Sequence, residues 1–169
     1  MRAVDGTAVV VMGVAGSGKT TVATLLGARL GWQVAEADDF HSSQNVAKMA
    51  SGVPLTDADR QPWLIAIRDW ISASDTSVLV TCSALRRSYR DVLRTADKRV
   101  RFLHLDGTAD LIGERIRARV DHFMPPALLD SQLSTLEPLQ PDEDGVVIGV
   151  SGTPHGVADR AMAALQLTR

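Results

Sequence analysis

The octapeptide Gly13-Val14-Ala15-Gly16-Ser17-Gly18-Lys19-Thr20 fits the pattern G-x-x-x-x-G-K-[S/T] of a loop that cradles nucleotide phosphates. Residues 8–12, directly before it, are all apolar and predict a buried strand. Residues 21–30, directly after it, place their large aliphatic side chains on one side of a predicted helix. A strand, a glycine-rich turn and a helix in this order aim backbone N–H groups and the positive end of the helix dipole at a phosphate.

The loop residues therefore predict a nucleotide site. The Lys19 ammonium adds a full positive charge to the backbone N–H groups, and the Thr20 hydroxyl is a ligand for Mg²⁺. The expected nucleotide-binding residues of this segment are Gly13, Ala15, Gly16, Ser17, Gly18, Lys19, Thr20 and Thr21.

Length and composition narrow the class of protein. The 169 residues favour one domain, residues 1–169, and a 45% hydrophobic content is enough for a sizeable core. A net charge of −2 and a pI of about 6.0 disfavour nucleic acid as a partner. Cys82 is the only cysteine, which excludes an internal disulfide and suits the reducing cytoplasm. Every apolar run is shorter than the roughly 20 residues of a membrane span, so no membrane partner is expected.

Predicted strands alternate with predicted helices along the whole chain. This alternation predicts parallel βαβ units and an α/β fold. Strands are expected over 8–12, 33–35, 77–82, 100–105 and 146–150. Helices are expected over 21–30, 44–50, 86–96, 109–119, 127–136 and 157–167, with another that has Thr56 as its N-cap and Trp63 and Trp70 on its core face.

An acidic cluster follows the second predicted strand. Glu36, Asp38 and Asp39 come just past the carboxyl end of that strand, where ligands bind in open α/β sheets. One carboxylate suits Mg²⁺ bound through water, and another suits a proton acceptor for a substrate hydroxyl, but the residues alone leave the assignment open between them. A solvated acidic turn is the alternative interpretation.

The third predicted strand ends without an acidic residue. Thr81, Cys82 and Ser83 stand where a Walker-B carboxylate is usual, so Mg²⁺ would depend on Thr20, the phosphates, water and the acidic cluster. Arginines are frequent on the two helices that follow. Arg115 and Arg119 share a helix face and suit a nucleotide base and its phosphates, although a solvated face is an equal alternative.

Three further blocks resemble the gluconokinase family. The first contains Asp38-Asp39-Phe40-His41 and continues through Lys48 to the segment Pro54-Leu55-Thr56-Asp57-Ala58-Asp59-Arg60-Gln61-Pro62-Trp63. The second is Cys82-Ser83-Ala84-Leu85-Arg86-Arg87-Ser88-Tyr89-Arg90-Asp91, and the third is Arg115-Ile116-Arg117-Ala118-Arg119 followed by His122-Phe123-Met124. The blocks stand in the family's order, and the segment from Pro54 to Trp63 and the whole second block are more specific than the phosphate loop.

The resemblance implies a three-layer P-loop NTPase fold of the adenylate kinase type. Its five-stranded parallel sheet would be flanked by helices, with a lid at approximately 117–128 and a substrate-binding helical insert at approximately 38–62. The implied activity is ATP-dependent phosphorylation of D-gluconate at its 6-hydroxyl to give 6-phospho-D-gluconate. Mg²⁺ would be required, and a cytoplasmic homodimer is expected.

The resemblance also assigns roles to single residues. Lys19, Asp38 and Arg119 would be catalytic, with Asp38 accepting the hydroxyl proton, while Arg115 and Pro154 would contact the adenine. Thr20 and Glu36 would serve the metal, although family members usually have Asp at the position of Glu36. The implied substrate-binding residues are Asp38, His41, Lys48, Arg60, Ser83, Arg87 and His122.

Three alternative interpretations compete with this one. Another small-molecule kinase of the same fold, such as a shikimate kinase, would share the phosphate loop, but the block from Pro54 to Trp63 argues against it. A non-catalytic nucleotide-binding module would be expected to lack Lys19, Asp38 or the lid arginine, and all three are present. An RNA-binding P-loop protein fits poorly with the acidic pI.

Overall fold

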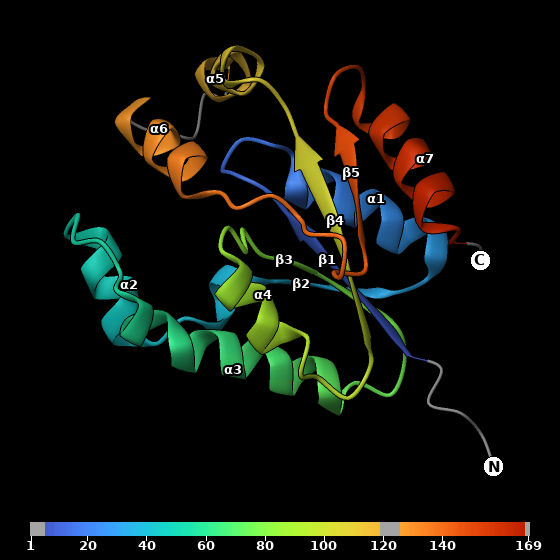
Figure 1. Cartoon of the computed structure of the whole chain (residues 1–169), viewed down its shortest axis with the longest axis horizontal. Helices are drawn as coiled ribbons and strands as arrows, with labels where there is room; N and C mark the ends of the chain where they lie inside the picture. The colour runs from blue at the N-terminus through green and yellow to red at the C-terminus, as the bar shows by residue number, and fades with distance from the viewer. Residues whose placement is uncertain (1–5, 119–125, 168–169) are drawn as a thin grey trace.

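The computed structural model describes residues 6–118 and 126–167, in which five strands form one all-parallel sheet of order β2-β3-β1-β4-β5 (Figure 1). The strands are β1 (Thr7–Met12), β2 (Gln33–Glu36), β3 (Val78–Thr81), β4 (Arg99–Asp106) and β5 (Gly145–Gly149). The helices are α1 (Lys19–Leu30), the short 3₁₀ helix η1 (Ala37–Phe40), α2 (Ser43–Ala50), α3 (Asp57–Ala73), α4 (Arg87–Leu93), α5 (Ala109–Ala118), α6 (Pro126–Thr135) and α7 (Pro154–Leu165). The predicted α/β fold with a five-stranded parallel sheet is confirmed.

The central strand β1 separates two apolar layers. Ala8, Val10 and Met12 pack with α3 and α4, whereas Val9 and Val11 pack with α1 and α7. All five side chains are fully buried, as expected of a strand that is covered on both faces of a parallel sheet. Figure 1 shows the same arrangement, with α1 and α7 on one side of the sheet and α3 on the other. The predicted three-layer organisation is therefore present.

The carboxyl end of the sheet is partly covered by a third apolar cluster. Val14 of the phosphate loop and Leu85, which follows β3, pack there with Ile112 of α5 and Leu129 of α6. This cluster joins the two helices that flank residues 119–125 to the end of the sheet where β1 and β3 stop.

Helix α3 begins at a capping box. The Thr56 hydroxyl accepts the Asp59 N–H at 3.1 Å, and the Asp59 carboxylate accepts the Thr56 N–H at 2.9 Å. Two N–H groups at the start of the helix are thereby satisfied. Thr56 is confirmed as the N-cap, and the same bonds fix where α3, which carries Trp63, enters the structure.

A fully buried ion pair ties α4 to the segment before β5. Arg90 and Glu143 have no exposed side-chain surface, and Arg90 Nε lies 2.6 Å from Glu143 Oε1. Arg90 Nη1 also donates to the carbonyl of Ala84 at 2.9 Å, where the backbone takes a left-handed conformation (φ 46°). Of the arginines that follow β3, Arg90 thus faces the protein interior.

Most predicted boundaries lie within a few residues of those observed. Helix α4 ends at Leu93 and not at residue 96, and β2 extends to Glu36 because Glu36 still pairs with Thr81 of β3. None of the helices in the described part of the chain is long and apolar enough to cross a membrane.

The buried and the exposed ion pairs of this fold predict different losses in the free energy of unfolding when a carboxylate is replaced by an amide. Glu143→Gln leaves the buried Arg90 guanidinium uncompensated and is expected to lower the free energy of unfolding by about 3–5 kcal/mol. Asp159→Asn removes a partner of Arg29 in an exposed pair and is expected to cost at most about 1 kcal/mol. Urea unfolding of both variants measures the difference; equal costs would contradict the structural role given to the buried pair.

Candidate active site

The phosphate loop joins β1 to α1 and depends on glycine at two positions. Gly16 (φ 82°) and Gly18 (φ 93°) adopt left-handed backbone conformations that other residues rarely take. A Cβ at Gly16 would also lie 2.6 Å from Ile116 Cγ1 of α5. The loop wraps around Lys19, whose Nζ donates to the carbonyls of Gly13 and Val14 at 2.9 and 3.0 Å. These contacts keep the ammonium at the centre of the loop.

A cavity of about 440 Å³ opens between the phosphate loop and the carboxyl ends of β2 and β3. Lys19 and Thr20 line it together with Glu36 and Asp38. Two carboxylates of the acidic cluster thus lie at the same cavity as the phosphate loop. Asp39 is exposed and does not line the cavity. The other lining residues are Ala15, Gly16, Gly18, Ala37, Trp63, Thr81, Cys82, Ser83 and Gln132.

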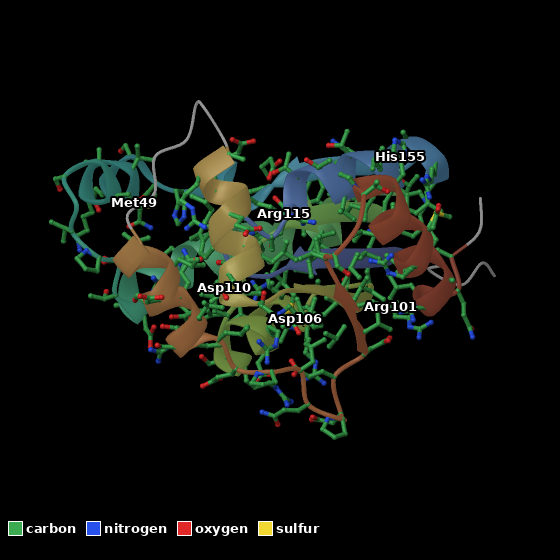
Figure 2. The ribbon with its side chains drawn as sticks, turned by 90° about the horizontal axis from the view of Figure 1, so that it is seen from above. Met49, Arg101, Asp106, Asp110, Arg115 and His155 are labelled. Carbon is green, nitrogen blue, oxygen red and sulfur yellow. The ribbon has the colours of Figure 1, made fainter. Side chains whose placement is uncertain are left out.

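A second cavity of about 290 Å³ lies on the other side of the phosphate loop, beside the start of α7. It brings Thr21 together with Arg115 and Pro154, two residues far from the loop in sequence. Arg115 donates through Nη2 to the carbonyls of Val150 and Gly152, the latter at 3.3 Å. Figure 2 shows Arg115 on the side of α5 that lies toward α7. Gly16, Ser17, Gly18, Val22, Gly152 and Val157 complete the lining.

Two side chains at the central cavity also belong to the hydrophobic core. Trp63 is 7% exposed and its Nε1 donates to the Ala37 carbonyl at 2.7 Å, which fixes the indole against η1. Cys82 is buried, and this burial raises the pKa of its thiol to about 12. The thiol is therefore protonated at neutral pH and packs in the core as a small apolar side chain.

His41 lies next to the cavity, stacked on the indole of Trp63 with 4.3 Å between ring centroids. Burial lowers the pKa of the imidazole, the Asp38 carboxylate opposes this shift, and the Arg60 guanidinium lowers the pKa further. The imidazole is thus neutral at pH 7. Nδ1 lies 3.3 Å from the amide nitrogen of Asn45, which donates to the Asp59 carbonyl at 2.9 Å. A neutral ring that accepts at Nδ1 presents an N–H donor at Nε2.

The basic residues of the helical insert are engaged with its own carboxylates and carbonyls. Lys48 Nζ donates to the Asp59 carboxylate at 2.8 Å, and this bond, with the Thr56 N–H, lowers the pKa of Asp59 to about 2. Arg60 Nη1 donates to the Leu55 carbonyl at 3.0 Å and to the Tyr89 hydroxyl at 3.1 Å. Neither Lys48 nor Arg60 lines the central cavity.

Arg87, for which the family resemblance implies a substrate contact, is engaged by side chains of the protein itself. Its guanidinium donates to Asp142 at 2.8 and 2.9 Å and to Asp91 at 2.7 Å, and these bonds raise its pKa further above the ordinary arginine value. Gln140 accepts another of its N–H groups. Arg87 does not line the central cavity, and its observed bonds give it a structural role between α4 and the segment before β5.

Gln132 is a site residue that the sequence did not suggest. It stands in the middle of α6, and its Oε1 accepts the N–H of Ala15 in the phosphate loop at 2.7 Å. Its side chain also lines the central cavity. A single glutamine within a helix carries no local signal for such a role, because only the packing of α6 over the loop brings it there.

The oxygen atoms around the central cavity suit a hard cation that arrives with a nucleotide. Thr20 and Glu36 line one cavity with the phosphate loop, and both carry the oxygen ligands that Mg²⁺ prefers. Within residues 6–118 and 126–167, no three His, Cys, Asp or Glu side chains gather as a metal cage. This donor set fits Mg²⁺, which usually retains water and phosphate ligands.

Two predicted site residues, Arg119 and His122, lie outside the described residues.

Comparison with known proteins agrees with this geometry. A family model described as "AAA domain" matches residues 9–139. A gluconokinase of Gluconobacter oxydans (strain 621H) is 52% identical over 150 residues, which cover 86% of this chain and 83% of that protein. The crystal structure of a gluconokinase from Sinorhizobium meliloti 1021 is 41% identical, with a TM-score of 0.88 over 98% of this chain and 94% of that one.

A further solved structure, an unliganded sugar kinase from Janibacter sp. HTCC2649, is 50% identical and has a TM-score of 0.89 over 95% of each chain. The match to the family model over residues 9–139 extends well beyond the phosphate loop and includes the cavity-lining residues on β2, β3 and α6. The chain belongs to the gluconokinase family of P-loop kinases.

Proposed function

We propose that this protein transfers the γ-phosphoryl group of ATP to the 6-hydroxyl of D-gluconate, giving 6-phospho-D-gluconate and ADP. The observation that carries the proposal is the shared cavity, which places a phosphate loop with its lysine beside a carboxylate able to accept a hydroxyl proton. The family's 52% identical relative is itself a gluconokinase, which supports the choice of acceptor.

The phosphate loop would bind the triphosphate. The first-turn N–H groups of α1, among them those of Thr20 and Thr21, lack an intrahelical acceptor and suit phosphate oxygens. Lys19 would stabilise the negative charge that moves to the leaving oxygen as the bond to the γ-phosphorus breaks. The second cavity would take the base, with Arg115 and Pro154 beside it.

Asp38 would act on the acceptor. It lines the cavity just after β2, so a hydroxyl group within hydrogen-bond reach of its carboxylate would also lie near the phosphate loop. As the oxygen of gluconate bonds to the γ-phosphorus, its proton would pass to Asp38. Ser83, which lines the cavity, would bind the hydroxyls and carboxylate of the sugar acid together with two nearby residues. These are His41, which stacks on the cavity-lining Trp63, and Arg60, whose charge affects the pKa of His41.

Mg²⁺ would be held by the Thr20 hydroxyl and, through water, by the Glu36 carboxylate, and when bound it supplies positive charge to the phosphates. The roles of Arg119, His122 and Lys48, the lid over 117–128, the insert over 38–62 and the homodimer stay predictions.

Coupled detection of ADP release with D-gluconate or shikimate as the acceptor tests the activity. Phosphorylation of shikimate in place of gluconate would contradict the proposal.

Lys19→Met is expected to lower kcat by at least about 100-fold, because it removes a positive group that stabilises the transition state. The side chain remains long and unbranched, so the fold should persist. Steady-state assays measure kcat and thermal unfolding checks the fold. A folded variant with near-normal turnover would exclude Lys19 from the mechanism.

Asp38→Asn is expected to lower kcat by about 10²–10⁴-fold while the Kd of ADP stays close to that of the parent, because the amide cannot accept the hydroxyl proton. Asp39→Asn is the matched control, since Asp39 is exposed and does not line the cavity. If Asp38→Asn and Asp39→Asn had equal kcat values, the assignment of the proton acceptor would be wrong.

Arg60→Gln is expected to raise the KM of gluconate more than that of ATP. A hydrogen bond to a charged group contributes about 1.5–3 kcal/mol, which corresponds to a rise of about 10- to 150-fold. Arg68→Gln, in an exposed ion pair on the same helix, is the control. A change confined to the KM of ATP would show that the carboxylate of gluconate binds elsewhere.

A further inference from the structure

Glu36 and Thr81 occupy matched positions at the ends of two adjacent strands. They are the last pair in the parallel register between β2 and β3, and Thr81 also pairs with Val11 of β1. Two residues earlier on each strand, Val34 and Leu79 pack with the α1 layer. Because side chains alternate along a strand, Glu36 and Thr81 project toward that same layer, at the end where α1 begins with Thr20 nearby.

The two side chains are hydrogen-bonded. The Thr81 hydroxyl donates to Glu36 Oε2, and Thr81 is only 4% exposed. A hydroxyl held by a buried strand is a rigid donor, because a β-branched residue has few χ1 alternatives. A glutamate has three rotatable side-chain bonds and would otherwise sample several positions. The bond therefore fixes one carboxylate oxygen and, with it, the direction of the other.

This bond bears on the missing Walker-B carboxylate. Strand β3 ends in Thr81, Cys82 and Ser83, so no acidic side chain is supplied at its end. The glutamate of the neighbouring strand reaches the end of β3 instead, and both partners of the bond line the cavity that contains Lys19 and Thr20. Strand β2 thus supplies the carboxylate, and Thr81 of strand β3 orients it.

We propose that Thr81 is a positioning residue, whose hydroxyl holds the Glu36 carboxylate at the end of β3 so that its second oxygen serves the nucleotide-bound Mg²⁺. The inference rests on the proposed Mg²⁺ role of Glu36 and deepens it. Partners that orient a metal-binding side chain typically contribute about 10- to 100-fold to metal affinity.

The experiment measures binding, not turnover. The Kd of ADP is determined by isothermal titration calorimetry in excess Mg²⁺ and in EDTA. The Kd in EDTA divided by the Kd in Mg²⁺ gives the gain in ADP affinity that is due to the metal. Thr81→Val keeps the β-branched shape and removes the donor, so it is expected to reduce this gain about tenfold. The Kd in EDTA is expected to stay unchanged, and Thr81→Ser is expected to restore the gain.

Two further variants complete the design. Thr95→Val, at an exposed threonine whose hydroxyl donates to the Val92 carbonyl, is the matched control and should keep the full gain. Glu36→Gln should lose the gain, and Thr81→Val should add little to that loss because the two residues act together.

The outcomes separate the two proposals. If Glu36→Gln loses the gain while Thr81→Val keeps it, the role of Thr81 is wrong and that of Glu36 stands. If Thr81→Ser behaves like Thr81→Val, the hydroxyl is not responsible, and the inference also fails. If Glu36→Gln keeps the full gain, the metal role of Glu36 is wrong, and the inference about Thr81 falls with it.

Discussion

The parallel pairing of β2, β3 and β1 is the constraint on which the site depends. Glu36, Thr81 and Val11 lie at one level across these three strands, and the phosphate loop begins within two residues of that level. Parallel strands bring their carboxyl ends to one edge of the sheet, so loops that are distant in sequence meet there. A pairing shifted by one residue would turn Glu36 and Thr81 to opposite faces.

Apolar burial builds the layers, whereas directional polar contacts place the loops above them. The core residues of β1 fix which helices cover each face, but side chains such as leucine do not select one loop conformation. The Arg90–Glu143 pair, the Gly13 N–H bond to the Ser83 carbonyl at 3.3 Å and the Gln132 contact to the phosphate loop supply that selection. Hydrogen bonds have preferred distances and angles, and unsatisfied buried polar groups are costly.

Prediction from local sequence was most reliable where a residue's role follows from its neighbours in the chain. The phosphate loop, the Thr56 N-cap and the alternating strands and helices are of this kind. Charged residues were less predictable, because an arginine or lysine has the same local pattern whether it meets substrate or another side chain. Arg87 shows this clearly, since its partner Asp142 lies 55 residues further along the chain.

The amino-acid sequence by itself determined the fold class, the phosphate loop and the family, since these depend on periodicity and on short motifs with fixed spacing. Only the tertiary structure decided that Glu36 and Asp38 share a cavity with Lys19, that Arg90 is buried, and that Gln132 contacts the loop. The physical reason is that such contacts are made between separate elements. Their geometry depends on strand order, register and helix packing, none of which is contained in a single segment.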